Sequence, residues 1–243
     1  MRSIGLINSM SIKPIYKEEI KNIILSLNPR KAGGPDNMKI ELIQRCLDEL
    51  IEPLMIIYEL SFKIGEVPNK MKIAKVVPIH KKGKMDQVNN YRPISLLSVF
   101  GKILEKLFCK RLIKFLDKNG IINKYQFGFR AKHSTSLALI DVMDDLYNEL
   151  DKNKYVLGLY LDLQKAFDTV NHSILLGKIK CYGIRGVAYN WINSYLTDRV
   201  QYTTNGDVCS EIGYINCGVP QGSIMGPILF LLYINDIHKA VPF

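Results

Sequence analysis

Hydrophobic residues recur with helical spacing over several stretches of the chain. In the first of these, Ile20, Ile24 and Leu27 fall on one face. The Gly- and Pro-rich segment that follows, residues 28–36, is expected to be a loop. The same spacing predicts helices over Lys17–Leu27, from the end of that loop to Ile64 with an interruption at Pro53, over Ser98–Lys118, over Ser134–Leu150 with a cap at Ser134 or Thr135, over Val187–Leu196 and over Ile224–Ile237.

Strands are predicted where apolar residues form an unbroken run or flank a turn. Val156–Leu161 is typical of a strand buried on both faces, and Ala74–Ile79 reads as a shorter buried strand. Gln201–Thr204 and Val208–Asn216 flank Asn205-Gly206, a dipeptide that favours a tight hairpin. Helices and strands are mixed without strict alternation, so we expect an α+β fold rather than a doubly wound sheet.

The composition is that of a globular protein. The 243 residues weigh 27.8 kDa and are 47% hydrophobic and 23% charged, which excludes wholesale disorder. The longest apolar stretch, Gly226–Asn235, is too short to span a bilayer, which takes about 20 residues. Met1–Met10 contains no sustained apolar run, so no secretory signal is expected. Because no stretch is long enough to span a bilayer, no membrane partner is expected. The length allows one large domain or two small ones.

Positive charge is concentrated in one part of the chain. The formal net charge is +10, but residues from Lys63 to Lys132 hold seventeen Lys and Arg against four Asp and Glu, a net charge of +13. The remainder of the chain is slightly acidic. Such a block is typical of a nucleic-acid partner, with an anionic membrane as the second choice. Charge alone is equally compatible with a solvated face that has no partner.

The cysteines lack the spacing of a metal site. No Cys-x-x-Cys pair occurs and no histidine lies at zinc-finger distance, so we expect no zinc. Their odd number and the missing signal favour reduced thiols inside the cell, in the nucleus or the cytoplasm. The five residues are Cys46, Cys109, Cys181, Cys209 and Cys217.

The segment YLDLQKAFD, residues 160–168, places an acidic residue at a strand end. The predicted strand ends at Asp162, and a helix is expected to begin within a few residues and to continue to about Cys181. The free N–H groups of a helix start attract phosphate, and a carboxylate beside them can hold Mg²⁺. Phe167 could then form the wall of a sugar site. The alternative is that Asp162 only caps the helix, which for an isolated pattern of this kind is the stronger reading.

Two further segments carry candidate ligand-binding residues. In GVPQGS, residues 218–223, a tight backbone presents Gln221, whose amide can bind a base, a sugar or a template strand. In the basic segment 76–98, Lys81 can neutralise a phosphate and Arg92 can grip a phosphate or stack on a base. The alternatives are an ordinary strand-to-helix turn and solvated surface charges.

Five blocks in this order resemble the reverse transcriptases of non-LTR, LINE-like retrotransposons. The resemblance covers nearly the whole chain and is carried by NPRKAGGPD, KKGKMDQVNNYRPISLLSVFGKILEKL, QFGFRAKHST, LYLDLQKAFDTVNH and GVPQGSIMGPILFLLYINDI. It implies a right-hand polymerase fold with an N-terminal extension and fingers (1–98), connecting helices (99–154) and a palm (155–243) whose antiparallel sheet packs on helices. It also implies copying of an RNA template from a DNA primer, with deoxynucleoside triphosphates and Mg²⁺, or Mn²⁺ as a substitute.

The resemblance also implies roles for individual residues. Asp162 would be catalytic and a metal ligand, and the Leu163 carbonyl would be a further ligand. Phe167 would exclude a ribose 2′-hydroxyl, and Asp168 would be structural. The residues implied to contact the incoming nucleotide are Lys81, Arg92, Lys165, Ala166, Phe167, Gln221 and Gly222, and those implied to face the template or brace the fingers are Gln126, Phe129 and Arg130.

One motif of the family is not found. Two-metal phosphoryl transfer needs carboxylates that hold both ions, but no aromatic-x-Asp-Asp follows Gln221. Tyr233–Asp236 resembles a degenerate copy, yet it falls in a predicted apolar helix, where the family has a similar Asn-Asp pair. We therefore expect a reverse transcriptase domain that stops inside the palm and is inactive alone. The alternatives are a non-catalytic nucleic-acid-binding remnant that uses its basic fingers and a decayed reading frame without a function as a protein.

Overall fold

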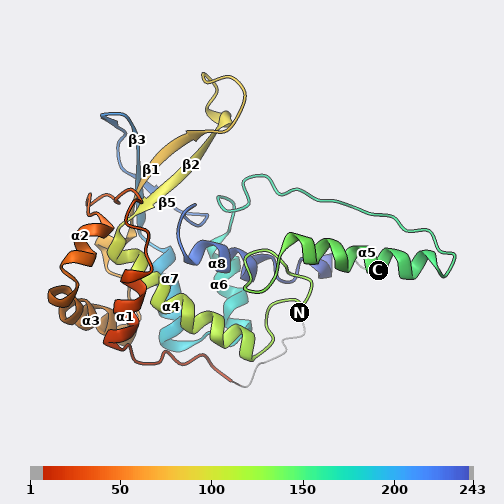
Figure 1. Cartoon of the computed structure of the whole chain (residues 1–243), viewed down its shortest axis with the longest axis horizontal. Coiled ribbons are helices and arrows are strands. Elements are labelled where there is room, and N and C mark those ends of the chain that lie inside the picture. Colours follow the sequence, from red (N-terminus) through yellow and green to blue (C-terminus); the bar gives the residue numbers. More distant parts are fainter. Residues whose placement is uncertain (1–7, 241–243) are drawn as a thin grey trace.

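The computed structural model of the chain describes residues 8–240. A helical body carries a sheet that rises from it and a long helical arm that extends to one side (Figure 1). Within the described residues, no helix combines the length and the apolar character needed to cross a bilayer. The body consists of α1 (Lys17–Leu25), α2 (Ile40–Arg45), α3 (Leu47–Ile64), α4 (Val99–Lys118), α6 (His172–Cys181), α7 (Gly186–Leu196) and α8 (Met225–Ile234), with short 3₁₀ turns at Asn69–Lys72 and Ile237–Ala240. A third 3₁₀ turn, Val88–Asn90, belongs to the sheet and lies directly before the strand Tyr91–Leu97.

The core of the body lies where α3, α4 and α7 meet. Trp191 of α7 is fully buried, and its ring stacks on Phe108 of α4 with 3.9 Å between the centroids. Its indole N–H donates a hydrogen bond to Ser61 Oγ of α3 over 3.0 Å. Burying one large aromatic side chain stabilises a fold by about 2–3 kcal/mol. These helices therefore form a firm base for the segments that pack on them.

The strands form one sheet in the order β2-β1-β3-β4, and β5 also pairs with β3. The β1–β2 pair is an antiparallel hairpin, and β3 and β4 form the hairpin predicted at Asn205-Gly206. However, β1 and β3 run parallel. The sheet is therefore mixed, whereas an antiparallel sheet had been expected. Parallel pairing is possible because the chain returns through a long crossover that contains α4 to α7. The strands are β1 (Ile73–His80), β2 (Tyr91–Leu97), β3 (Arg199–Asn205), β4 (Val208–Cys209) and β5 (Gly213–Ile215).

The expected interruption at Pro53 is wrong, because α3 runs through this residue. The break in the helical region lies instead at Cys46, between α2 and α3. A proline inside a helix removes one hydrogen bond and costs about 3 kcal/mol. Pro53 lies on the exposed side, where water can reach the unpaired carbonyl, whereas Leu54, Tyr58 and Phe62 on the other side are buried. Burial of that face offsets the cost of the proline.

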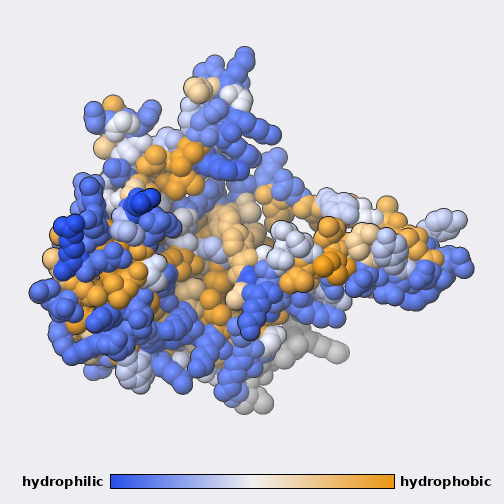
Figure 2. All heavy atoms as spheres, viewed as in Figure 1, coloured by the Kyte–Doolittle hydropathy of each residue, from blue (hydrophilic) through white to orange (hydrophobic). Residues whose placement is uncertain are grey.

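The arm consists of α5 (Thr135–Leu150) and the segment 151–163 that returns toward the body (Figure 1). Of the two predicted caps, Ser134 and Thr135, it is Ser134 that caps the helix, since its side chain accepts a hydrogen bond from Leu137 N over 3.1 Å. No residue of α5 is buried. Apolar side chains are therefore displayed along the arm (Figure 2), namely Leu137, Leu139, Ile140, Val142, Tyr147 and Leu150.

The strand predicted over Val156–Leu161 is wrong, because this segment forms neither strand nor helix. Its side chains are exposed, with Leu157 at 95% and Tyr160 at 88%. A strand is stabilised only when a neighbouring strand pairs with its backbone N–H and C=O groups. Within residues 8–240, no strand pairs with this segment. The residues of this apolar run are therefore of the types found in buried strands. A buried strand also needs a neighbouring strand to pair with, and the local sequence does not supply one.

Candidate active site

The turn at Pro220-Gln221-Gly222, hereafter the PQG turn, lies against the end of β2. Ser95 N of β2 donates a hydrogen bond to Gln221 O over 2.7 Å. Gly222 has a φ of +113°, and a Cβ added to it would lie 2.8 Å from Ser95 O. Only glycine combines this backbone conformation with so close an approach. The tight backbone predicted for this turn thus makes its close approach to β2.

Segment 165–172 lies against the PQG turn and the residues before it. Val219 N donates a hydrogen bond to Phe167 O over 2.8 Å. The Gln221 side chain donates from Nε2 to Asp168 Oδ1 over 3.0 Å. Two blocks that are distant in the sequence therefore meet in one site, and the Asp168 side chain makes one of the contacts between them.

Gly218 completes this contact. Its φ is +84°, and a Cβ added to it would lie 2.8 Å from Asp168 O, so a larger residue would separate the two blocks. His172 Nε2 lies 2.7 Å from Gly218 O, which fixes the side chain at the start of α6. The PQG turn is consequently held from both sides by backbone and side-chain contacts.

The helix expected directly after Asp162 begins only at His172, as α6. Residues in between form a turn, in which Lys165 has a φ of +52° and its carbonyl accepts a hydrogen bond from Asp168 N over 2.8 Å. Asn171 caps α6 through its side chain, which sets where the helix starts. The prediction that Asp162 lies beside a helix N-terminus is therefore wrong.

Asp162 and Leu163 lie in the extended part of the arm, and both are exposed. Within residues 8–240, no group of three or more His, Cys, Asp or Glu side chains is arranged to hold a metal ion. Asp162 offers one carboxylate, whereas phosphoryl transfer with two ions needs more than one. The Asp162 carboxylate can therefore serve as one ligand of a divalent ion. It does not by itself make a complete two-ion centre.

Phe167 is the residue at which three of the sequence blocks meet. Its ring centroid lies 5.2 Å from that of Phe230 on α8 and 6.0 Å from that of Phe129. Phe129, with a φ of +57°, belongs to a loop that Arg130 braces by donating from Nη1 to Gln126 O over 3.2 Å. Arg130 and Gln126 thus hold the loop, and Phe129 reaches the site. Nothing in the local sequence indicates this contact, because α5 separates Phe129 from Phe167 along the chain.

Lys81 and Arg92 lie on the β1–β2 hairpin, which projects away from the body (Figure 1). Lys81 N closes the hairpin loop by donating to Asn90 O over 2.8 Å, while the lysine side chains of the loop point to solvent. Arg92 pairs in register with Ile79 and is also exposed. The structure therefore joins one group of the expected site residues and leaves a second group on exposed segments. The first group is Phe129, Phe167, Gln221 and Gly222, and the second is Lys81, Arg92, Asp162 and Leu163.

The Asn235-Asp236 pair at the end of α8 makes structural contacts. Asn235 Oδ1 accepts a hydrogen bond from Asn123 N over 2.8 Å. Asp236 forms an ion pair with Lys178 of α6. Partial burial opposes ionisation of Asp236, but the hydrogen bond and the charge of Lys178 outweigh it and lower the pKa. These contacts agree with the interpretation that this pair is not a catalytic motif.

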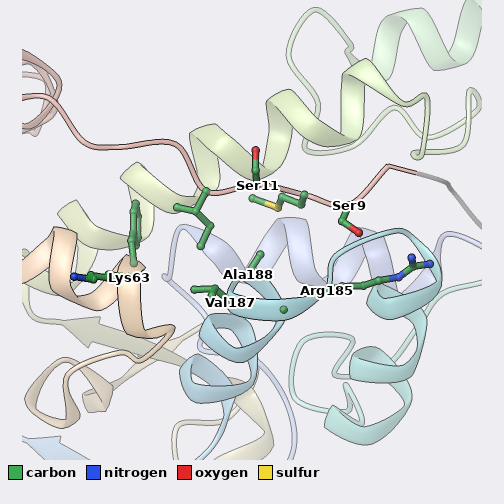
Figure 3. Close-up of a pocket in the computed structure, with 10 residues that line it drawn as sticks. Ser9, Ser11, Lys63, Arg185, Val187 and Ala188 are labelled. Atoms are coloured by element: carbon green, nitrogen blue, oxygen red, sulfur yellow. The ribbon is translucent and has the colours of Figure 1, made fainter.

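A cavity of about 500 Å³ lies elsewhere, between residues 9–12, the end of α3 and the start of α7 (Figure 3). Lys63 and Arg185 stand at its two ends, and much of its wall is apolar. Within the described chain, none of the site residues expected from the sequence lines this cavity. It is therefore separate from the PQG turn.

Comparison with known proteins identifies the family to which these blocks correspond. A sequence model described as "Reverse transcriptase (RNA-dependent DNA polymerase)" matches residues 79–242. The match includes the β1–β2 hairpin except its first residues, the exposed segment with Asp162 and the PQG turn.

Individual relatives extend the similarity to the N-terminal helices. The chain is 35% identical over 235 residues to "RNA-directed DNA polymerase from mobile element jockey" of Drosophila melanogaster, covering 96% of this chain and 26% of that protein. It is 34% identical over 241 residues to "Probable RNA-directed DNA polymerase from transposon BS" of the same species, again covering 96% and 26%. For "Probable RNA-directed DNA polymerase from transposon X-element", also of D. melanogaster, the identity is 31% over 231 residues, covering 95% and 25%. The chain thus spans about a quarter of the length of the curated relatives it matches.

Proposed function

Because the chain belongs to the reverse transcriptase (RNA-dependent DNA polymerase) family, we propose that it contributes the fingers and part of the palm to a polymerase that copies RNA into DNA. Its domain is of the kind found in non-LTR retrotransposons. The observation that carries the proposal is the contact between segment 165–172 and the PQG turn, since it joins two blocks of the family in one site. In this proposal, residues 1–98 form an N-terminal extension and the fingers, residues 99–154 connect them, and the palm begins at residue 155.

The incoming deoxynucleoside triphosphate would bind over the PQG turn. Phe167 is already packed between two other aromatic rings and would restrict the sugar. Gln221, whose amide is oriented by Asp168, would face the base or the template. The other proposed nucleotide contacts are Gly222, the backbone N–H groups of Lys165 and Ala166, and Lys81 and Arg92 from the exposed hairpin.

Template and primer would lie along the basic part of the chain. The charge excess between Lys63 and Lys132 supports a polyanionic partner. Phe129 would contact the template beside Phe167, while Gln126 and Arg130 would keep its loop in place. RNA template and DNA primer are thus the proposed partners.

Reverse transcriptases use divalent metal ions, and we propose Mg²⁺, with Mn²⁺ as a substitute. Asp162 and the carbonyl of Leu163 would hold one such ion, which when bound stabilises the charge that develops in phosphoryl transfer. Because the described residues contain no group of three or more His, Cys, Asp or Glu side chains arranged to hold a metal ion, the chain alone is expected to be inactive.

The test uses the purified chain with a labelled DNA primer annealed to an RNA template in Mg²⁺ buffer. We expect no primer extension, but tighter primer–template binding when the complementary deoxynucleotide is added and no such effect from the other three. Gln221→Ala should abolish the nucleotide effect and leave nucleotide-free binding unchanged. Extension by the wild-type chain would disprove the expected inactivity and would support the polymerase assignment if Asp162→Ala abolished it.

A second candidate function is nucleic-acid binding without nucleotide selection. The basic block from Lys63 to Lys132 favours it independently of the PQG turn. Salt-sensitive RNA binding that no deoxynucleotide affects would support this second function and contradict the proposed nucleotide pocket. If neither RNA nor the primer–template bound, both functions would be excluded for this chain.

A further inference from the structure

A buried carboxylate from α4 anchors the start of α8, directly after the PQG turn. Glu105 is 3% exposed, and its Oε2 accepts hydrogen bonds from Ile224 N over 2.7 Å and from Met225 N over 3.1 Å. Unpaired N–H groups at a helix start need acceptors when they are buried. Here the acceptor comes from a helix more than one hundred residues earlier in the chain.

The remaining N–H groups of the first turn of α8 are satisfied locally. Ser223 Oγ accepts from Gly226 N over 2.9 Å and donates to Pro220 O over 2.8 Å, which closes the PQG turn on the helix. Pro227, the next residue, has no N–H group. The position of the turn relative to α4 is therefore set by Glu105.

Tyr195 holds Glu105 on its other side, and Arg199 packs against Tyr195. Tyr195 donates its hydroxyl to Glu105 Oε1 over 3.2 Å. The Arg199 guanidinium lies 4.7 Å from the centre of the Tyr195 ring and is fully buried. Arg199 Nη1 donates to Tyr195 O over 3.0 Å, whereas its Nε and Nη2 have no hydrogen-bond partner among the described residues.

The charges of this cluster depend on one another. Burial raises the pKa of Glu105, while Arg199 and the two backbone N–H groups act against that rise. A buried arginine with two unpaired N–H groups is costly unless a negative charge lies nearby. The only acidic side chain that is buried within residues 8–240 is Glu105. The cluster therefore couples α4, α7 and β3 to the PQG turn.

We propose that Glu105 is a positioning residue for the nucleotide pocket, which it serves by holding the PQG turn in register with β2 and segment 165–172. The inference rests on the proposed function, because that function places Gln221 and Gly222 in the pocket. Glu105 itself is buried beneath the turn and touches no nucleotide. Its role is to keep the Gln221 amide and the close Gly222–Ser95 approach in place.

Three substitutions of Glu105 separate the effect of its side-chain length from the effect of its negative charge. Glu105→Ala removes the acceptor, and Glu105→Asp keeps the charge on a side chain one methylene shorter. Glu105→Gln removes the charge but can keep its oxygen toward Ile224 N and Met225 N while its NH₂ group faces the Tyr195 oxygen. If Glu105 acts by position, Gln should preserve the turn better than Asp or Ala does, although it leaves Arg199 without a nearby negative charge.

The first readout is amide hydrogen exchange in the full chain, which requires no polymerase activity. We expect exchange at Ile224 and Met225 to accelerate at least tenfold in Glu105→Ala and Glu105→Asp, relative to the amide of Ile24, which is fully buried in α1 of the same protein. In Glu105→Gln the change should stay within about threefold. Ser61→Ala, which removes the buried partner of the Trp191 indole and does not touch α8, is the matched control and should leave Ile224 and Met225 at the wild-type ratio.

The second readout is the deoxynucleotide concentration that half-saturates the tightening of the primer–template complex. It should rise at least fivefold in Glu105→Asp and return to within about twofold of wild type in Glu105→Gln, while binding without nucleotide stays unchanged. Unaltered exchange at Ile224 and Met225 in both Glu105→Asp and Glu105→Ala would overturn the positioning role. If Glu105→Ala does not fold, Glu105→Asp against Glu105→Gln decides. If exchange changes as expected but no variant responds to nucleotide, wild type included, the proposed function fails while the anchoring role of Glu105 stands.

Discussion

The PQG turn and the segment 155–163 both carry sequence blocks of the reverse transcriptase family, but their environments differ completely. The PQG turn contacts β2, segment 165–172 and the buried Glu105. Segment 155–163 is at least as apolar, yet its side chains lie in solvent, as do those of the neighbouring α5 (Figure 2).

The difference shows that an apolar sequence indicates where burial is favourable, whereas burial itself depends on a partner surface. The helix α8 finds such a surface in α4 and α6, with Lys178 and Asp236 at its end and Glu105 at its start. The segment before Asp162 has none among the described residues.

Truncating one leucine in each region should separate them most clearly. Leu229 of α8 is fully buried and Leu157 is 95% exposed. Leu229→Ala should lower the free energy of unfolding by about 2–5 kcal/mol, because it leaves a cavity, whereas Leu157→Ala should change it by less than about 0.5 kcal/mol. Urea unfolding measures both. A cost above about 1.5 kcal/mol for Leu157→Ala would show that segment 155–163 is buried in solution.

Adding one methyl group to a glycine tests the close approach at the PQG turn. Gly222→Ala should destabilise the chain by about 2–3 kcal/mol, since Ala is strained at a φ of +113° and its Cβ would meet Ser95 O. Gly177→Ala is the matched control, because its Cβ would meet nothing within 4 Å in the interior of α6. That control should raise stability by about 0.5–1 kcal/mol, since alanine favours helix. Equal effects in the two variants would contradict the tight packing of the turn.

A double-mutant cycle tests whether the hydrogen bond between the two blocks contributes to stability. Gln221→Ala and Asp168→Ala should show a coupling energy of about 1 kcal/mol, because the Gln221 amide donates to the Asp168 carboxylate. The same cycle with Asp162→Ala in place of Asp168→Ala should give no coupling, since Asp162 lies on the exposed segment. Coupling to Asp162 of similar size would place the two regions in contact.

The smallest expected effect concerns pH. The pKa of Asp236 is lowered in the folded chain, so its ion pair with Lys178 contributes stability above the pKa of the unfolded aspartate, about 3.9, and loses it as pH falls through the lower folded value. Asp236→Asn should therefore be less stable than wild type by about 0.5 kcal/mol at pH 7, and the difference should vanish in strong acid. Thermal unfolding between pH 2 and 7 measures the stability of both proteins. If Asp236→Asn is still less stable than wild type at pH 2, the loss of stability comes from altered packing and not from the ion pair.

Several elements follow from local sequence. The spacing in Ser98–Lys118 and the cap at Ser134 predicted α4 and α5 closely, and Asn205-Gly206 marked the β3–β4 hairpin. These predictions succeeded because helix caps and two-residue turns depend on neighbours in the chain. The helix predicted directly after Asp162 was wrong because local features were overlooked. A turn at Lys165 and the cap at Asn171 place the start of α6 at His172.

The site itself needed the folded chain. The contacts of Phe129 with Phe167, and of Glu105 with Ile224 and Met225, join residues far apart in sequence. Neither the spacing of hydrophobic residues nor a sequence motif indicates such pairs. Several other aromatic or acidic residues of the chain could have made the same contacts.

The sequence by itself determined the family, most of the helices, the β3–β4 hairpin and the basic part of the chain, since these depend on residue order and local conformational preference. Only the tertiary structure decided which apolar segments are buried and which site residues meet. The PQG turn is held because its backbone and side chains find partners in β2, segment 165–172 and Glu105. The segment before Asp162 stays exposed because, within residues 8–240, its backbone finds no strand to pair with, and hydrophobic character alone cannot provide those hydrogen bonds.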